Sequence, residues 1–455
     1  MTARAPSIST PPSVPLRFPT FPTFPIAPYP VVGHLPQLLR DPMKFFLELG
    51  LGRDLAPYQV GREVRFLVNH PDALREIWQN PLYERQRAVR KVMASVVGQN
   101  LFSQEGTAHR RPRRMMQPAF HREKLGGYLE PMVKHASGAL NSWSQGQKLD
   151  LNLETRRVAL DIVGESLFSL EPPDQVKRVT SALSQLLPRL DNHILLYGIL
   201  PDTLKVSYWG RDKVALETVR GGLDWFVRSR RALKPQARDL MDMLLETRDE
   251  DGSALSDNEV AAQALTLMSA GFETSANTLA WMFYLLARHP EVRAKLEAEL
   301  DSVLGGRPVT LEDLPRLKYT EYVVKETQRL YPAAWLTSRI PTRDVTLLGR
   351  PLAAGTLLLT SAFMTHRDKR YFADPTRFWP ERFAQEGNFP KFAYLPFGAG
   401  IHQCIGNIFA LWEMKVVLAT WASRVRLELP EGFTPEYHLA ITLGPKTLPV
   451  TVHLR

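Results

Sequence analysis

Residues 392–406 read FAYLPFGAGIHQCIG and contain Cys404, the only cysteine among the 455 residues of the chain. After Cys404, apolar side chains recur at steps of three and four residues, and this period predicts a helix. These side chains are Ile405, Ile408, Phe409, Trp412 and Val416. The residues before Cys404 are interrupted by Pro and Gly and are typical of a loop. We therefore expect Cys404 where a loop meets a helix N-terminus, a position that stabilises a thiolate.

A thiolate in this position is suited to act as a nucleophile or as a metal ligand, although an isolated cysteine is commonly a small buried apolar side chain. Gly398 and Gly400 suggest backbone with an unusual φ or in contact with something flat, and Gly406 leaves the first turn of the helix bare. A bulky planar cofactor needs such clearance. The pattern Phe-Gly-x-Gly-x-His-x-Cys-x-Gly, which runs from Phe397 to Gly406, resembles the haem-binding signature of the cytochrome P450 family.

This resemblance implies a mainly α fold with a minor β region, in which haem b (iron protoporphyrin IX) lies between a long central helix and the helix after Cys404. It implies that Cys404 is the proximal thiolate ligand of the iron. It also implies that Phe397, Gly398, His402 and Gly406 bind the cofactor. The activity that it implies is insertion of one oxygen atom of O2 into a C–H bond.

A second stretch indicates the long central helix. Ser256 and Glu259 form a capping box ahead of an apolar run that continues to about Ala287 and stops before Pro290. A helix of this length spans ~46 Å. An apolar helix of this kind is expected to be buried on most sides.

The middle of this helix reads AGFETS, residues 270–275, and places Glu273 in an otherwise apolar segment. A buried carboxylate is costly unless it has a partner, and Thr274 can simply donate a hydrogen bond to the carbonyl of Ala270. The hexapeptide also resembles the oxygen-binding motif of the P450 family. That resemblance implies that Gly271 thins the helix where dioxygen binds, and that Glu273 and Thr274 are the catalytic pair that delivers protons.

The next candidate segment is strongly basic and contains His109 and Arg113 ahead of Pro-Ala-Phe. By itself it is typical of a solvated cationic helix face. The spacing resembles the propionate-binding helix of the family, which implies that His109 and Arg113 bind the haem carboxylates through charge-assisted hydrogen bonds. Arg339 matches a further propionate-binding arginine of the family. Pro112 is expected to kink this helix.

The arginines of this segment that do not bind haem, Arg110, Arg111 and Arg114, are expected to face outward. Lys and Arg number 57 and Asp and Glu 47, a net charge of +10. A basic surplus suits nucleic acid, a membrane surface or an acidic protein, and we find no nucleic-acid-binding motif. The resemblance implies an acidic ferredoxin or flavodoxin as the electron donor. NAD(P)H supplies the electrons to this donor indirectly, through the donor's reductase.

A third motif places Glu326 and Arg329 three residues apart on one predicted helix face. Such a pair is usually an exposed one that contributes little. The sequence around it, with Arg382 in a later Pro-Glu-Arg-Phe segment, resembles the family's structural ion cluster. The resemblance implies that Glu326, Arg329 and Arg382 together fix the loop before Cys404.

The rest of the chain sets the organisation. Residues 1–30 are rich in proline and are expected to be a flexible tail, and residues 31–455 one haem-thiolate domain. We expect a helix over 35–50, a hairpin over 58–68, a helix from 71 to 78, no regular pattern over 80–105 and several helices over 126–250. A single cysteine and no apolar run of membrane-spanning length predict a cytoplasmic protein, which we expect to be a monomer.

The substrate pocket is the least defined part of the site. The expected lining residues are mostly apolar and carry no charge: Leu265, Met268, Ser269, Phe272, Leu336 and Leu443. They suggest a lipid-like substrate such as a fatty acid, terpenoid or carotenoid. Two alternatives remain open, a peroxide-using relative of the same fold and a thiolate-haem sensor or electron carrier that is not an enzyme.

Overall fold

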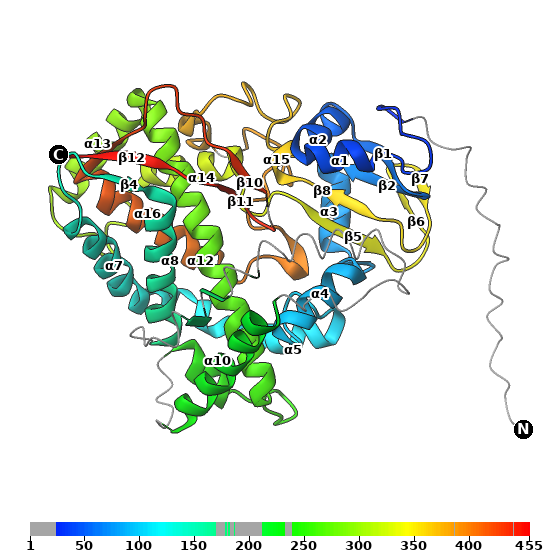
Figure 1. The fold of residues 1–455 in the computed structure, drawn as a ribbon, viewed down its shortest axis with the longest axis horizontal. Coiled ribbons are helices and arrows are strands. Elements are labelled where there is room, and N and C mark those ends of the chain that lie inside the picture. The colour runs from blue at the N-terminus through cyan, green and yellow to red at the C-terminus, as the bar shows by residue number, and fades with distance from the viewer. Residues whose placement is uncertain are drawn as a thin grey trace, which may run out of the picture.

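The computed structural model describes residues 24–169, 212–232, 239–385, 387–439 and 441–455, with a few single positions between 178 and 186. Figure 1 shows a helical part built around the long helix α12 and a strand-rich part beside it that carries α1, α2 and α3. The chain is therefore mainly α with a minor β region, as the sequence predicts.

The helical part contains most of the described helices. They are α4 (Arg87–Val97), α5 (Gly106–Met116), α6 (Arg122–Leu125), α7 (Leu129–Asn141), α8 (Leu151–Phe168), α10 (Lys213–Ala232), α11 (Leu240–Glu246), α12 (Asp257–Arg288), α13 (Pro290–Leu304), α14 (Lys318–Leu330) and α16 (Asn407–Ala422). Four short 3-10 helices join them: η1 (Gln117–Phe120), η2 (Gly126–Tyr128), η5 (Pro380–Phe383) and η6 (Gly400–His402).

The strand-rich part contains a five-stranded sheet in the order β1-β2-β8-β5-β3. Its strands are β1 (Leu55–Val60), β2 (Glu63–Val68), β8 (Leu358–Thr360), β5 (Thr337–Pro341) and β3 (Tyr83–Glu84). The predicted hairpin is β1 paired antiparallel with β2, whereas β2 and β8 run parallel. The helices that accompany the sheet are α1 (Leu35–Arg40), α2 (Pro42–Gly50), α3 (Pro71–Gln79) and α15 (Ala362–Thr365).

Three smaller sheets complete the fold. β12 (Pro449–Leu454) lies between β4 (Lys148–Asp150) and β9 (Val425–Glu428). β6 (Val345–Leu347) pairs with β7 (Arg350–Leu352), and β10 (Tyr437–Leu439) pairs with β11 (Leu443–Pro445). The β10–β11 hairpin returns the chain to α12, to which it is hydrogen-bonded.

The prediction for the long helix is confirmed. α12 begins after Ser256, whose side chain forms the expected capping box with Glu259, and it ends at Arg288. From Val260 to Phe283 every residue is buried except Ser269, Ala270, Gly271 and Thr274, which are half-buried. The burial of α12 is therefore interrupted at one place, in the middle of the helix.

Several local predictions are wrong. The helix expected over 35–50 is two helices, because Asp41 caps a new helix that begins at Pro42. Residues 87–97, for which no pattern was expected, form α4, which buries only Val92 and Val96. The apolar residues at 89, 92, 93, 96 and 97 do recur at helical spacing, so the expectation of no pattern missed a period that the sequence contains.

The two ends of the chain fall partly outside the described residues. Residues 1–23 of the expected tail are among those not described, but contacts begin before the expected boundary at Val31. Ile26 packs against the apolar cluster of the strand-rich part, and its carbonyl oxygen lies 2.7 Å from Nε2 of His34. Within the described residues, no helix combines the length and apolar character needed to cross a membrane.

Candidate haem-binding site

The loop before Cys404 is held in a tight conformation against helix α3. The Cys404 amide donates a 2.9 Å hydrogen bond to the Phe397 carbonyl. Gly398 and Gly400 both have φ +64°, so the unusual backbone expected from the sequence is present. A Cβ at Gly400 would lie 2.0 Å from the carbonyl oxygen of Trp78, and one at Gly398 3.0 Å from its indole ring.

These distances give a different reason for the presence of glycine at positions 398 and 400. The sequence suggested clearance for a planar cofactor, but the flat group that Gly398 and Gly400 contact is Trp78 of α3. Gly406 differs again, because a Cβ there would meet Phe120 at 3.5 Å, an ordinary contact. The loop glycines are thus explained by packing between α3 and the Cys404 segment.

Cys404 lies where the sequence places it, three residues before the first residue of α16. Its side chain is accessible, which is unusual for a cysteine. Burial of its surroundings raises the pKa of the Cys404 thiol, while the Gly406 amide and Arg113 act in the opposite direction. The Gly406 amide and Arg113 therefore favour the thiolate, and burial opposes it.

The two predicted histidines lie in contact beside this loop. Nδ1 of His402 is 3.4 Å from Nε2 of His109, and the rings meet edge to face. Nε2 of His402 also lies 2.7 Å from Oε2 of Glu105, although it is not aligned as a hydrogen bond. Burial, together with nearby positive charge from Arg85, lowers the pKa of His109 to about 3 and of His402 to about 4. Both imidazoles are therefore neutral here, and the charged His109 expected from the sequence is not found.

Guanidinium groups surround this pair. Arg339 is 2% exposed, stacks 4.4 Å from the Trp78 ring, and donates to the Ser338 carbonyl. Burial and the like charge of Arg85 lower the pKa of Arg339 to about 9. Arg85 is itself paired with Glu105, at 3.4 Å.

Arg113, the third predicted carboxylate-binding residue, lies on α5, which continues as one helix through Pro112. It is close enough to Cys404 for the two to affect each other's pKa. Arg85 and Arg339 both lie close enough to Glu105 to feel its charge, and Arg113 adds a third guanidinium group beside Cys404. This positive excess, with a neutral histidine pair, fits a cofactor that carries two carboxylates and binds a thiolate, as haem does.

The predicted catalytic residues lie at the break in the burial of α12. The Thr274 hydroxyl donates a 2.7 Å hydrogen bond to the Ala270 carbonyl, the local contact that the sequence left open. Gly271 faces α8, because a Cβ there would lie 3.2 Å from Val163. Gly271 therefore allows α8 and α12 to approach each other.

Glu273 is 7% exposed, and its partners come from other elements. Thr442 donates a 3.1 Å hydrogen bond to Oε1 of Glu273, and Nη1 of Arg156 on α8 lies 4.0 Å from the same oxygen. Burial raises the pKa of Glu273, and Arg156 and Thr442 act against that rise. The sequence did not indicate Arg156 or Thr442 as partners of Glu273, because both are distant from Glu273 along the chain.

The structure brings together the three residues of the expected ion cluster, all at most 4% exposed. Arg329 forms two hydrogen bonds with Glu326, of 2.7 and 2.8 Å, and Nε of Arg382 donates to Glu326 at 3.0 Å. Arg329 also donates to the carbonyls of His366 and Pro375. The cluster is thus buried and joins α14 to the segments that follow α15.

His366 connects this cluster to the Cys404 loop, a link that the sequence did not reveal. Its Nε2 accepts a 3.0 Å hydrogen bond from the Leu395 amide, and its Nδ1 lies 3.2 Å from the Arg329 carbonyl. Burial and the charge of Arg329 lower the pKa of His366 to about 3, so the ring is neutral and can accept and donate at once.

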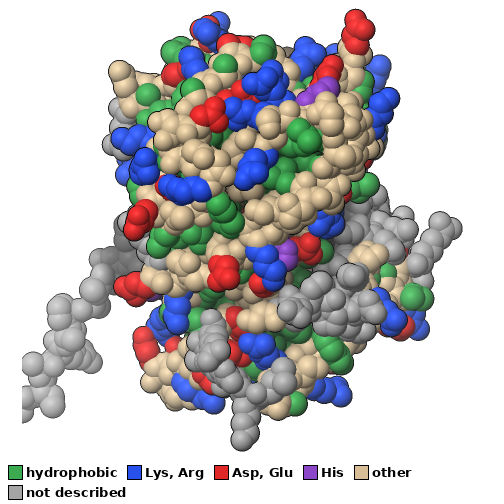
Figure 2. Space-filling view, turned by 90° about the vertical axis from the view of Figure 1, so that its left-hand side faces the viewer, with side chains coloured by type: hydrophobic (Ala, Val, Ile, Leu, Met, Phe, Trp, Pro, Cys, Tyr) green, Lys and Arg blue, Asp and Glu red, His purple; other side chains and the backbone are tan. Residues whose placement is uncertain are grey.

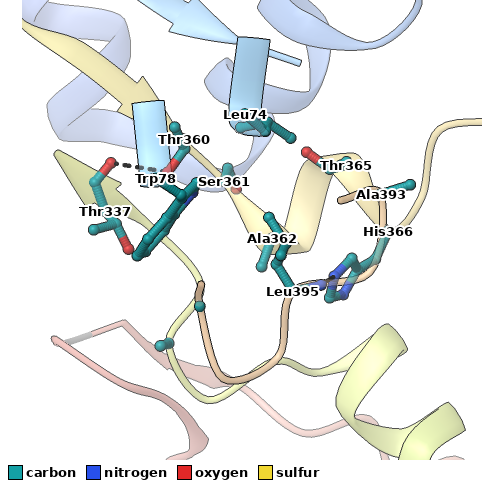
Figure 3. Close-up of a pocket in the computed structure, with 12 residues that line it drawn as sticks. Leu74, Trp78, Thr337, Thr360, Ser361, Ala362, Thr365, His366, Ala393 and Leu395 are labelled. Carbon is teal, nitrogen blue, oxygen red and sulfur yellow. Dashed lines mark hydrogen bonds between the residues drawn. The ribbon is translucent and has the colours of Figure 1, made fainter. Parts of the chain in front are cut away.

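A cavity of about 30 Å³ lies beside His366. Figure 3 shows His366 and Leu395 close together on one side of it, with Trp78 on another. Nε1 of Trp78 and Oγ1 of Thr365 are buried there without a hydrogen-bond partner among the described residues. The support of the Cys404 loop is therefore packed closely on the α3 side, except at this small polar space.

The expected pocket residues do not form one cluster. Leu265 packs with α4 and α10, Leu443 belongs to the cluster of the strand-rich part with Leu336 against it, and Met268 and Phe272 lie in the main core. The guanidinium carbon of Arg156 lies 5.6 Å from the Phe272 ring centre, which places Phe272 toward α8. Between Val260 and Phe283, the α12 residues that keep accessible surface are Ser269, Ala270, Gly271 and Thr274.

The outward arginines of α5 are largely neutralised. Arg114 pairs with Asp249 and Glu250, the latter at 2.6 Å, and Arg111 lies 3.3 Å from Asp249. Arg114 does face outward as expected, whereas Arg111 is only partly exposed, and both are paired with acidic residues. Arg110 is exposed, and no ion pair is found for it within the part of the chain that the structure describes.

Comparisons with known proteins give the family of the chain. A family model for cytochrome P450 matches residues 22–452. The chain is 35% identical over 412 residues to cyclooctat-9-en-7-ol 5-monooxygenase of Streptomyces melanosporofaciens, with 89% of each chain covered. It is 33% identical over 427 residues to pentalenene oxygenase of Streptomyces avermitilis, covering 92% of this chain and 94% of the relative.

A third similar protein is cyclooctatin synthase of Streptomyces melanosporofaciens, at 31% identity over 427 residues, with 91% of this chain and 92% of the relative covered. The chain belongs to the cytochrome P450 family. It is a monooxygenase, an enzyme of the haem-dependent oxidoreductase class. The family and fold inferred from Cys404 and the segments around it are thereby confirmed.

Proposed function

We propose that this enzyme inserts one oxygen atom of O2 into a C–H bond of an apolar cyclic terpenoid. The observation that carries the proposal is the single half-buried stretch of α12, residues 269–271 with Thr274, which offers no charged side chain. Two similar proteins are named for oxygenation of cyclooctat-9-en-7-ol and of pentalenene. A small, rigid hydrocarbon suits an uncharged site better than a fatty acid, whose carboxylate would need a partner.

The proposal gives the described residues separate roles. When haem is bound, its iron supplies the activation of dioxygen, and Cys404 is its thiolate ligand. Arg339, Arg113 and His109 hold the haem carboxylates. Glu273 and Thr274 deliver protons, because an acid and a hydroxyl on an otherwise apolar helix supply protons while the packed surroundings exclude bulk water.

The electrons come, in this proposal, from an acidic ferredoxin or flavodoxin reduced by NAD(P)H. Arg110 is the exposed α5 arginine for which the described residues show no ion pair. We also propose a monomeric cytoplasmic enzyme in which residues 31–455 form one catalytic domain, consistent with a family match that spans residues 22–452.

Binding spectra test the substrate class. Purified enzyme loaded with haem is titrated with pentalenene and, as a matched probe, a linear fatty acid of the same carbon number. We expect a substrate-type change of the haem absorption with the terpene and none with the acid. The opposite order would contradict a terpenoid substrate.

Product formation tests the reaction. We expect oxygenated terpene only when NADPH, a ferredoxin and its reductase are all present, with label from ¹⁸O2 in the product. Turnover supported equally by hydrogen peroxide alone would favour the peroxide-using alternative. Normal haem binding without any oxygenated product from the terpenes or fatty acids would favour a sensor.

A further inference from the structure

The turn before β11 is fixed directly to the middle of α12. A Cβ at Gly444 would lie 2.4 Å from Oδ1 of Asn277, so only glycine allows this approach. Nε1 of Trp281 donates a 3.2 Å hydrogen bond to the Leu443 carbonyl. On the other side, Nδ2 of Asn152 on α8 donates to the carbonyl of Pro445 at 3.0 Å. The turn therefore has little freedom to move relative to α8 and α12.

Thr442 lies inside this anchored turn and is 6% exposed. Its hydroxyl accepts a 3.0 Å hydrogen bond from Nδ2 of Asn277 and donates a 3.1 Å hydrogen bond to Oε1 of Glu273. A hydroxyl has one proton to donate, and Asn277 orients the oxygen so that this proton points at the carboxylate.

For Glu273, this is the one hydrogen bond to its carboxylate from the described residues. Arg156, at 4.0 Å, contributes charge but is too distant for a hydrogen bond. A carboxylate that is nearly buried depends strongly on each donor it receives. The Thr442 hydroxyl therefore decides which way the Glu273 carboxyl points.

The neighbours of Thr442 connect this contact to the apolar parts of the molecule. Ile441 packs against the cluster that contains Leu265 of α12, and Leu443 belongs to the cluster that contains Trp335. Apolar packing on both sides thus sets the position of the Thr442 hydroxyl, and the hydroxyl sets the position of the acid.

We propose that Thr442 is a positioning residue that orients the Glu273 carboxyl for proton delivery. The inference rests on the proposed function, in which Glu273 delivers protons. Thr442 itself transfers no proton. It holds Oε1 of the acid in one place, beside Arg156, and so fixes the direction in which the rest of the carboxyl points.

Infrared spectroscopy of the haem-loaded enzyme tests the contact directly, without turnover. The carboxyl band of Glu273 is assigned by its loss in Glu273→Gln. In Thr442→Val, which keeps the shape and removes the donor, we expect this band to shift. We also expect its titration midpoint to rise by about one pH unit, because the hydrogen bond favours the charged form. Thr442→Ser should restore both values.

Two controls separate this effect from general loss of structure. Thr266→Val also removes a buried hydroxyl from this region, but that hydroxyl donates to the Ala262 carbonyl of its own helix, so the Glu273 band should not move. Thermal unfolding and the carbon-monoxide spectrum should remain those of a folded thiolate-haem protein in Thr442→Val.

The coupling of NADPH consumption to product formation tests the functional role of Thr442. With a ferredoxin, its NADPH-dependent reductase and pentalenene as the probe, we expect Thr442→Val to release several times more peroxide per NADPH, with the KM for the probe little changed. If Glu273→Gln leaves coupling intact, the proton-delivery role of Glu273 fails. If Glu273→Gln uncouples but Thr442→Val changes neither the band nor the coupling, the role of Thr442 is overturned.

Discussion

Cys404 is the proposed thiolate ligand of the haem, and the sequence contains no other cysteine that could replace it. We expect Cys404→Ser to lose the red-shifted band of the reduced carbon-monoxide complex, because a serine oxygen does not replace the thiolate. Circular dichroism should show that the helices remain. Survival of the band in this variant would contradict the assignment of the ligand.

Thr274 has a matched neighbour on the same helix. Thr274 and Thr266 each donate a 2.7 Å hydrogen bond to the carbonyl four residues earlier, but only Thr274 lies in the half-buried stretch of α12. We expect Thr274→Ala to lower product formed per NADPH at least tenfold, at the low end of the scale for acid–base steps. Thr266→Ala should leave this ratio unchanged. Equal effects in the two variants would show that the Thr274 hydroxyl only forms its hydrogen bond within the helix and has no catalytic role.

Glu413 is a buried acid that the sequence did not single out. It is fully buried on α16, accepts a 2.6 Å hydrogen bond from Ser275, and has no partner for Oε1 among the described residues. Burial raises the pKa of Glu413 from 4.5 to about 8. The Glu413 carboxyl therefore keeps its proton in the folded protein at pH values above 4.5, where the unfolded chain loses it.

This proton makes stability depend on pH in a definite direction. Stability from Glu413 is fully present below pH 4.5 and is lost as pH rises toward 8, by up to about 1.4 kcal/mol for each pH unit. We expect Glu413→Gln to flatten that decline in denaturant titrations between these pH values. Glu436→Gln, at an exposed site paired with Lys446, should keep the slope of the parent protein. An unchanged slope in Glu413→Gln would show that the acid is already ionised.

At the scale of elements, the buried ion cluster joins α14 to η5 and, through His366, to the Cys404 loop. Glu326→Ala would leave Arg329 and Arg382 buried without their carboxylate, which costs ~3–5 kcal/mol. We therefore expect protein with little haem, measured as haem absorbance per chain.

The matched control is Glu297→Ala, which removes a carboxylate paired with the half-exposed Arg426. It should keep normal haem content, because water can solvate the arginine that remains. Equal haem content in the two variants would show that the Glu326 cluster does not support the loop.

Predictions for elements succeeded where a motif or a long period was available. The capping box and apolar run specified α12, and the Gly-bounded strands specified β1 and β2. α4 was missed although its apolar residues at 89, 92, 93, 96 and 97 recur at helical spacing. α5 continues through Pro112, which is buried in the helix interior, because tertiary packing compensates a local helix breaker.

At the scale of the whole molecule, the surplus of ten positive charges is spread over the surface. On the face shown in Figure 2, Lys and Arg side chains are mixed with Asp and Glu. On α5, the pairing of Arg111 and Arg114 with residues 249 and 250 reduces the field available to a partner. Attraction of an acidic carrier must then depend on unpaired groups such as Arg110.

We expect Arg110→Glu to slow reduction by an acidic ferredoxin severalfold at low salt and to have little effect at high salt, since screening acts beyond ~8–10 Å at physiological ionic strength. Stopped-flow reduction of the haem measures this rate. Arg62→Glu, on the β1–β2 turn, is the control for a change of net charge alone. Equal slowing by the two variants would show that the protein's total charge, and no local site, steers the carrier.

The sequence by itself determined the family, the mainly α fold and the residues that meet in the ion cluster, and it led to the proposal of Cys404 as the ligand. It could do so because these features depend on short, fixed spacings, such as Phe397 to Gly406, or on a long apolar period. The contact of Glu326 with Arg329 is also local, because residues three apart on a helix share a face.

Only the tertiary structure decided which groups surround the reactive ones. Glu273 meets Thr442 and Arg156, His402 meets Glu105, and Gly400 meets Trp78, all across large separations in the chain. The charges of His109, His402 and Glu413 likewise follow from burial, which belongs to the assembled molecule. The spacing of residues along the sequence does not predict such contacts, because they arise from packing between elements and not from the periodicity of a single helix or strand.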